Sequence, residues 1–225
     1  MTHLRRLPRR PPLRRRTGRA LARLALLLAL LAGCATRPSA VSPRLPQEEL
    51  AGLASWYGHP YHGRKTANGE TYDMGGLTAA HRTLPFHSRV RVERMDNGRQ
   101  IDVRINDRGP FVEGRVIDLS QEAARRLGML EKGVAPVRLL PLRIPSDAEA
   151  RWLVLVGGFR RQEDAEAFAA QAGGRPRTAR VLAGWHGDSR QFHVQIRNFY
   201  GEEDAWHAAA RLRREGYSAF LVRSQ

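Results

Sequence analysis

The stretch "VRVERMDNGRQIDVRINDRGP", from Val90 to Pro110, decides the architecture expected of the first half of this chain. Apolar and polar residues alternate on both sides of Asn97-Gly98. That alternation is the period of a strand with one buried face, and Asn-Gly between two such runs is a strong hairpin signal. We therefore predict a β-hairpin whose second strand delivers Asp107 to a turn at its end.

One helix is predicted nearby, in "SQEAARRLGM". Ser120 or Asp118 would cap its N-terminus and Gly128 lies near its end. The remaining residues of this region form short β-prone runs joined by glycine-rich loops. Short strands around a single helix indicate a small, mainly β barrel, which we place at residues 51–145.

The last 80 residues contain a repeat with an offset of forty, in which "WLVLVGGFRRQEDAEAFAA" (residues 152–170) matches "FHVQIRNFYGEEDAWHAAA" (residues 192–210). Each copy combines an alternating strand with an Ala-rich amphipathic helix, and a further β-prone run follows each helix. We therefore predict a second, α+β domain at residues 146–225 with the order βαββαβ. Its helices would cover one face of the sheet.

Within the second copy, His193, Gln195 and Arg197 alternate with apolar residues and would point to the uncovered face of that sheet. Two interpretations stay open. The three polar side chains are either an ordinary solvated face or a platform on which amide and guanidinium groups bind the hydroxyls of an extended sugar polymer.

The N-terminus carries the pattern of an export signal. Residues 1–33 hold nine arginines and no acidic residue, and an apolar run from Leu24 to Ala32 follows them, too short to span a bilayer comfortably. A buried core helix is the alternative, and the arginines argue against it. The formal charge is +16; without the nine arginines, 29 basic residues oppose 22 acidic ones, a net charge of +7. These charges form no block, so we predict no nucleic-acid partner.

Cys34 is the only cysteine, which excludes an intramolecular disulfide. "LAGC" (residues 31–34) resembles the bacterial lipobox, whose cysteine is acylated and becomes the first mature residue. That resemblance implies a lipid anchor, and Ala35 after the cysteine favours the outer membrane. The proline-rich residues 34–50 would be an extended tether.

Candidate chemistry concentrates in "TANGETYDMGGLTAAH" (residues 66–81), which holds Glu70, Asp73 and His81, and around Asp107 and Asp118. A carboxyl acting as a general acid near neutral pH needs a raised pKa, which Glu70 and Asp73 could give each other. Each residue also has a structural alternative. Glu70 and Asp73 suit turns, Asp118 suits a helix cap, and His81 suits a hydrogen-bonded structural position.

Asp107 has such an alternative too, because it could form a salt bridge with Arg108, whose charge would hold a carboxylate ionised. Trp56 and Tyr57 would offer flat apolar faces to a sugar ring, although a small barrel also needs core aromatics. His59 and His62 lack metal-ligand spacing with acidic or cysteine partners. We predict neither a metal nor a cofactor.

The motifs "ASWYG", "HGRKTANGETYD", "TAAHRTLP", "VRINDRGPF" and "IDLSQEAARRLG" occur in order across the first region. In these motifs the chain resembles the rare lipoprotein A family. The resemblance implies a six-stranded double-psi β-barrel like that of expansins, and an endolytic lytic transglycosylase of peptidoglycan. It also implies that Glu70, Asp73, His81, Asp107 and Asp118 support catalysis, with Trp56, Tyr57 and Arg108 binding the sugar.

The forty-residue repeat resembles the sporulation-related repeat (SPOR) domain, a small ferredoxin-like fold that binds peptidoglycan glycan lacking stem peptides and gathers at division septa. Leu155 departs from that family's pattern, because it occupies a position where glutamine is usual. The resemblance implies an envelope protein at the septum, monomeric and close to division proteins. The alternative is a non-catalytic, expansin-like protein that binds and remodels the wall.

Overall fold

The structure is a computed structural model that describes residues 50–146, 150–173, 177–185 and 188–224. The predicted signal sequence, Cys34 and the tether before Leu50 lie outside the described residues. Two bodies of regular structure are present, and each is described by itself.

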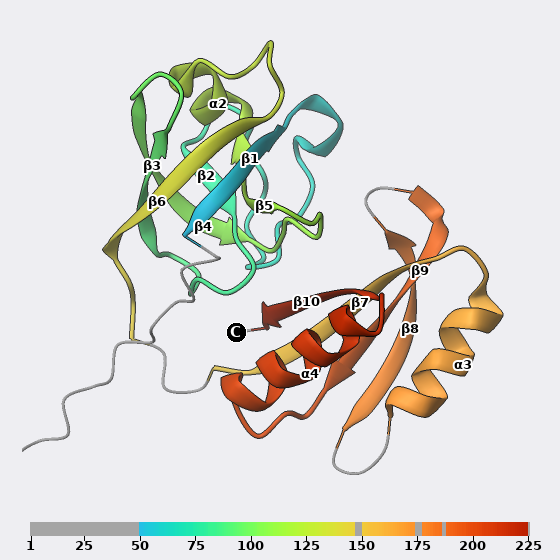
Figure 1. The fold of residues 1–225 in the computed structure, drawn as a ribbon. Helices are drawn as coiled ribbons and strands as arrows, with labels where there is room; N and C mark the ends of the chain where they lie inside the picture. Colours follow the sequence, from blue (N-terminus) through green and yellow to red (C-terminus); the bar gives the residue numbers. More distant parts are fainter. Residues whose placement is uncertain (1–49, 147–149, 174–176, 186–187, 225) are drawn as a thin grey trace, which may run out of the picture. The chain divides into compact units, whose positions relative to one another are not determined.

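Six strands form a closed barrel with the order β1-β5-β2-β4-β3-β6 (Figure 1). They are β1 (Ala51–Tyr57), β2 (Thr78–Ala80), β3 (Arg89–Arg94), β4 (Gln100–Asp107), β5 (Arg115–Ser120) and β6 (Ala135–Arg143). The pairs β1/β5 and β2/β4 are parallel, and the other neighbours are antiparallel. The predicted six-stranded barrel is confirmed.

The hairpin predicted from Val90 to Asp107 is formed by β3 and β4, with Val92 opposite Ile101. Gly98 has φ 68°, a left-handed conformation that a side chain would strain. The apolar residues of both strands point inward. They join the barrel core, whose large, fully buried side chains include Leu84, Val90, Val92, Ile105, Ile117, Leu119, Leu127, Met129, Val137 and Leu139.

Helix α2 (Gln121–Leu127) closes one part of this core with Ala123, Ala124 and Leu127. The Oγ of Ser120 accepts a hydrogen bond from the N–H of Ala123 at 3.3 Å, and Gly128 ends the helix with φ 72°. Of the two proposed caps, Ser120 is therefore the one used. Asp118 lies inside β5 and does not cap the helix.

The second body is a four-stranded sheet with the order β10-β7-β9-β8. Its elements are β7 (Trp152–Phe159), α3 (Gln162–Ala172), β8 (Thr178–Trp185), β9 (Asp188–Arg197), α4 (Glu202–Arg214) and β10 (Ser218–Arg223). The predicted order βαββαβ is confirmed. Among the helices of the described residues, none is both long and apolar enough to cross a membrane.

Alternate residues of the sheet pack against the two helices. Val154 and Val156 of β7 and Val194 and Ile196 of β9 share one core with apolar residues of α3 and α4, led by Phe168. His193, Gln195 and Arg197 fall between these positions, so they lie on the face that the helices leave uncovered.

The forty-residue repeat places equivalent residues side by side. Leu155 and Gln195 are equivalent in the repeat and are also register partners across β7 and β9, flanked by the pairs Val154 with Ile196 and Val156 with Val194. A pseudo-twofold axis therefore passes between Leu155 and Gln195, at the centre of the sheet.

Candidate active site

A polar groove of about 440 Å³ opens at one rim of the barrel. It is lined by the ends of β1 and β5 and by the segment that follows β4. The lining residues that carry polar or aromatic side chains are Ser55, Trp56, Tyr57, Tyr61, Asp107, Arg108, Phe111, Arg115 and Asp118. Two carboxyl groups and a wall of aromatic rings therefore face the same space.

Strand β2 explains why two aspartates separated by eleven positions meet here. Ala80 is the parallel partner of Asp107 on β4 and the antiparallel partner of Asp118 on β5. The two aspartates are therefore two strand spacings apart, about 10 Å between Cα atoms. The side chain between them is a single methyl group, which leaves room for both carboxyls to reach the groove.

Asp107 combines partial burial with a free oxygen. Its Oδ1 accepts hydrogen bonds from the N–H groups of Ala67 (2.9 Å) and Arg108 (2.8 Å). Within the described residues no donor reaches Oδ2. Burial raises the pKa of Asp107 and the charge of Asp118 adds to it, while the two N–H groups and the Arg108 charge oppose the rise. A carboxyl in this state keeps its proton to higher pH than an exposed aspartate.

Asp118 is in a different state, because both of its oxygens are occupied. Ser55 donates its hydroxyl to Oδ1 at 2.6 Å, and Arg115 donates Nη2 to Oδ2 at 2.9 Å. The parallel register of β1 and β5 sets Ser55 directly beside Asp118. An aspartate held in this way carries a fixed negative charge next to the Asp107 carboxyl.

The aromatic wall is formed mainly by tyrosines. The ring of Tyr57 packs against Tyr61 edge-on at 6.0 Å and against Tyr72 at 4.3 Å between centroids. Burial raises the pKa of the Tyr57 phenol, and the negative charges of Asp107 and Asp118 raise it further. Trp56 lines the groove with part of its ring and packs against the barrel core with the rest. Its core packing is therefore observed, while sugar binding by its groove-facing part stays a prediction.

Glu70 and Asp73 do not line this groove. They lie along a second groove of about 500 Å³, together with Arg89, Asp102 and Arg104. The Arg104 guanidinium donates to both oxygens of Glu70 at 2.7 and 2.9 Å, and Asn106 donates to Oε2 at 3.1 Å.

These hydrogen bonds, that of Arg104 first, lower the pKa of Glu70 to about 2. The prediction that Asp73 would raise it is wrong, because cationic and amide donors dominate around the carboxylate. Asp73 is mostly exposed, and its Oδ1 accepts a hydrogen bond from the N–H of Gly75 at 2.9 Å. This is an Asx turn, the structural alternative considered for Asp73. A 3.9 Å contact joins it to the His62 ring.

His81 is fully buried. The ring nitrogen Nδ1 accepts hydrogen bonds from the backbone N–H groups of Thr83 (3.2 Å) and Leu84 (3.1 Å). The backbone N–H of His81 donates to the carbonyl of Asp107 at 3.2 Å. The ring therefore orders the turn after β2, and burial keeps it from binding a sugar directly. Its link to Asp107 runs through the backbone.

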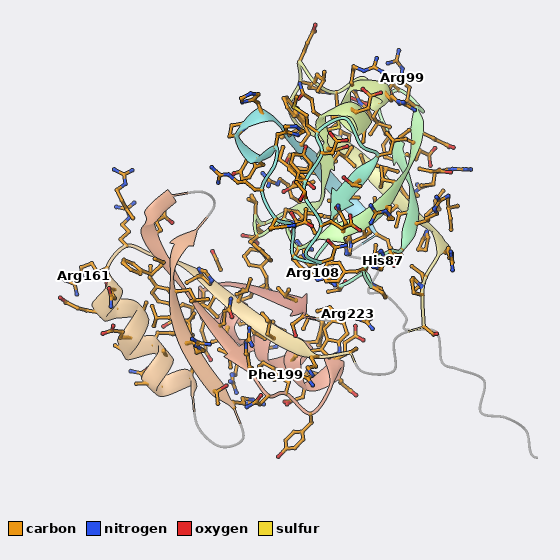
Figure 2. All side chains as sticks on the ribbon, turned by 180° about the vertical axis from the view of Figure 1, so that it is seen from behind. His87, Arg99, Arg108, Arg161, Phe199 and Arg223 are labelled. Atoms are coloured by element: carbon orange, nitrogen blue, oxygen red, sulfur yellow. The ribbon has the colours of Figure 1, made fainter. Side chains whose placement is uncertain are left out.

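Arg108 (Figure 2) lines the groove, but its guanidinium is held by backbone carbonyls. Its Nη1 donates to the carbonyls of His81 (3.2 Å) and Leu84 (2.9 Å), and its guanidinium lies 3.6 Å from the centre of the Phe86 ring. The side chain thus holds the turn after β2. Its backbone N–H, not its guanidinium, is what hydrogen-bonds to Asp107.

On the second sheet, the predicted platform residues are tied to their own surroundings. His193 Nδ1 lies 2.6 Å from the carbonyl of Gly184, and Arg197 donates to Gln195 Oε1 at 3.1 Å. Leu155 stands beside Gln195 on the same face. The face is therefore polar along β9 and apolar along β7.

The contributors that were not predicted include Ser55, Tyr61, Arg104, Asn106, Arg115 and the Ala67 N–H. The alternation in "VRIND" carried one usable signal, since it sets Arg104 and Asn106 on a common, outward face just before Asp107. Ser55 and Arg115 depend on which strands are neighbours, and no local pattern reports that.

Comparison with known families matches the barrel region, residues 49–139, to the lytic transglycolase domain. Residues 148–223 match the SPOR domain. Both matches agree with the order of domains expected from the motifs.

Three curated relatives are each named endolytic peptidoglycan transglycosylase RlpA. The one from Campylobacter jejuni is 55% identical over 92 residues, covering 41% of this chain and 34% of the relative. That from Pseudomonas aeruginosa (strain UCBPP-PA14) is 59% identical over 90 residues, covering 40% and 26%. That from Neisseria meningitidis is 45% identical over 125 residues, covering 54% and 52%.

The matched part thus spans from about a quarter to about half of the length of these relatives. A lytic transglycolase domain precedes a SPOR domain, and the chain is 45–59% identical to proteins of that name over 90 to 125 residues. With this order of domains, the chain is similar to the rare lipoprotein A (RlpA) family.

Proposed function

We propose that this chain is an endolytic lytic transglycosylase that cuts the MurNAc-GlcNAc bonds of peptidoglycan strands lacking stem peptides. Its relatives of that name support the activity. The SPOR match supports peptidoglycan as the surface to which the chain binds. The observation that carries the proposal is the state of Asp107, which is partly buried, raised in pKa and has a free Oδ2 in an aromatic groove.

Asp107 would act as both acid and base. Its carboxyl donates a proton to the glycosidic oxygen as the bond to C1 of MurNAc breaks. The C6 hydroxyl of the same sugar then attacks C1, and its proton returns to the Asp107 carboxylate. The products are a free 4-hydroxyl on GlcNAc and a 1,6-anhydroMurNAc end, so no water is consumed.

The other groove residues would support this step. Positive charge develops on the sugar ring as the bond breaks, and the fixed negative charge of Asp118 stabilises it. Tyr57, Tyr61 and Trp56 would hold pyranose rings against their faces. A hydrolase of the two-carboxylate type needs a second carboxylate to activate water. Ser55 and Arg115 already occupy Asp118, which favours the single-carboxyl reaction.

We place the protein in the cell envelope, anchored through acylated Cys34 to the periplasmic face of the outer membrane. The SPOR domain would concentrate it at septal glycan, near division proteins, with a monomer as the working unit. His193, Gln195 and Arg197 would contribute the sugar contacts of that domain. These assignments rest on the sequence motifs and the SPOR match.

The test is incubation of the full chain in detergent with purified glycan strands lacking stem peptides, followed by mass spectrometry. Shortened strands with 1,6-anhydro ends are expected. Ordinary reducing ends would identify a hydrolase. Strands that are bound but left intact would replace the proposal with the expansin-like, non-catalytic role.

A further inference from the structure

Glu70 does not line the groove of Asp107, yet its side chain hydrogen-bonds to the strand that carries Asp107. Both of its carboxylate oxygens contact β4, through Arg104 and Asn106. These residues stand three positions and one position before Asp107. The Glu70 side chain therefore holds the segment that carries it against the end of the strand that presents Asp107.

That segment is a closed turn. The N–H of Thr66 donates to the carbonyl of Glu70 and the N–H of Gly69 donates to the carbonyl of Thr66, both at 2.9 Å. The Oδ1 of Asn68 accepts the hydroxyl of Thr66 at 2.7 Å and the N–H of Glu70 at 3.1 Å. With its ends and its centre joined in this way, the turn moves as one unit.

Ala67 lies inside the turn, and its N–H donates to Asp107 Oδ1 at 2.9 Å. The neighbouring N–H of Asn68 donates to the carbonyl of Asn106 at 3.3 Å. One side of the turn thus contacts Asp107 directly, while the Glu70 side chain fixes it from the other side. A donor to a carboxylate stabilises the charged form and orients the oxygens.

We infer that Glu70 is a positioning residue, which holds the Thr66–Glu70 turn on β4 and thereby keeps the Ala67 N–H on Asp107. The inference rests on the proposed function, in which Asp107 moves the proton. The ion pair with Arg104 leaves Glu70 poorly suited to that task, since a pKa of about 2 means that it holds no proton near neutral pH.

Other groups also face Asp107, and the test must separate their effects from that of Glu70. The Tyr57 phenol faces it from β1, and Asp118 with its partner Arg115 from β5. The charge of Arg108 acts from the following residue. After β2, His81 contacts Asp107 through its backbone N–H. A Glu70 variant leaves all of these side chains in place.

The direction of the pKa change distinguishes positioning from plain electrostatics. Replacing Glu70 with glutamine removes a negative charge and releases the Arg104 charge, and through space both changes would lower the pKa of Asp107. Loss of the Ala67 N–H has the opposite effect, because the charged carboxylate loses a donor. A rise in the pKa of Asp107 is therefore the signature of positioning.

The experiment follows the Asp107 carboxyl by ¹³C NMR in the full chain in detergent, with Asp107→Asn identifying the signal. Glu70→Gln should raise the Asp107 pKa by about one unit. It should shift the pH dependence of strand cleavage upward by the same amount. Glu122→Gln is the matched control, because Glu122 also pairs with two arginine side chains and its pKa is also lowered to about 2. It should leave the Asp107 pKa unchanged.

An unchanged or lowered pKa in folded Glu70→Gln would overturn the inference. So would loss of cleavage at every pH without a pKa shift, since Glu70 would then act on the sugar itself. If Glu70→Gln does not fold, Arg104→Lys, which keeps the charge but loses the two-pronged contact, is measured by the same criteria. If the wild type cuts no strands, the proposed function fails, while the NMR pKa still decides the positioning.

Discussion

Asp107 illustrates how one side chain acquires a chemical role from its immediate surroundings. Its sequence neighbour Arg108 left a salt bridge open as the structural alternative, but the Arg108 guanidinium binds carbonyls of the turn after β2. Burial then raises the pKa of Asp107, and two backbone N–H groups and the nearby Arg108 charge oppose that rise. A group of this kind costs the folded state stability whenever it is ionised.

Asp107→Asn should lower the rate of strand cleavage by about 100- to 10,000-fold, because the proton donor is lost while the Oδ1 acceptor remains. Mass spectrometry of the products checks the rate. Retained binding to intact strands would show that the fold survives. Near-normal cleavage would rule out Asp107 as the acid.

The same variant should also stabilise the protein against unfolding at pH 7 to 8. The pKa of Asp107 is higher in the folded state than in the unfolded state, so its favourable contribution exists at low pH and is lost as pH rises through the folded pKa. Asparagine does not ionise. Thermal unfolding as a function of pH should show a gain over wild type in the neutral range that disappears on acidification.

Glu70 should show the opposite dependence. Its pKa is lowered from 4.5 to about 2 in the folded state, so it stabilises the fold above pH 4.5 and this contribution is lost as pH falls toward 2. Urea unfolding should therefore find Glu70→Gln less stable than wild type at pH 7 and nearly equal to it close to pH 2. A difference independent of pH would contradict the assigned ion pair.

At the level of secondary-structure elements, the sequence predicted what local patterns encode. The β3–β4 hairpin follows from alternation around Asn97-Gly98, and helix α2 from its cap and its terminal glycine. The parallel pairs β1/β5 and β2/β4 join segments far apart in the chain. No local period reports such a pairing, which is why Ser55, Arg115 and the separation of Glu70 from Asp107 were missed.

A substitution of Ser120 tests how much the junction between β5 and α2 contributes to stability. The Ser120 Oγ accepts the N–H of Ala123 and donates to the carbonyl of Gly76 at 2.6 Å, in a fully buried position. Ser120→Ala should lower the free energy of unfolding by about 1–2 kcal/mol. Chemical denaturation measures this; a change below about 0.5 kcal/mol would mean that the cap is not needed.

At the scale of the whole molecule, barrel and sheet have separate cores, each assembled from its own elements. The motifs predicted both folds because the barrel motifs occur in order and the repeat is regular. They could not tell whether His193, Gln195 and Arg197 bind sugar, because an outward-facing position on a strand is the same for a solvated and for a binding residue.

Cleavage of glycan strands and binding of these strands should therefore respond to different substitutions. Gln195→Ala removes an amide from the uncovered face and the acceptor used by Arg197. Affinity for peptide-free strands should fall about fivefold, as expected for one hydrogen bond, with the cleavage rate at saturating substrate unchanged. Co-sedimentation with strands and product analysis measure the two quantities. Unchanged affinity would assign Gln195 to the solvated face.

The residues at the pseudo-twofold axis, Leu155 and Gln195, differ, so the uncovered face is not symmetric about that axis. If the two residues were identical, the centre of the sheet would look the same after half a turn, and a polymer laid across it would bind equally well forwards or backwards. Here an apolar side chain meets an amide at the axis. A glycan strand has chemically distinct ends, so if this face binds the strand as proposed, its two orientations would differ in free energy and one polarity would be preferred.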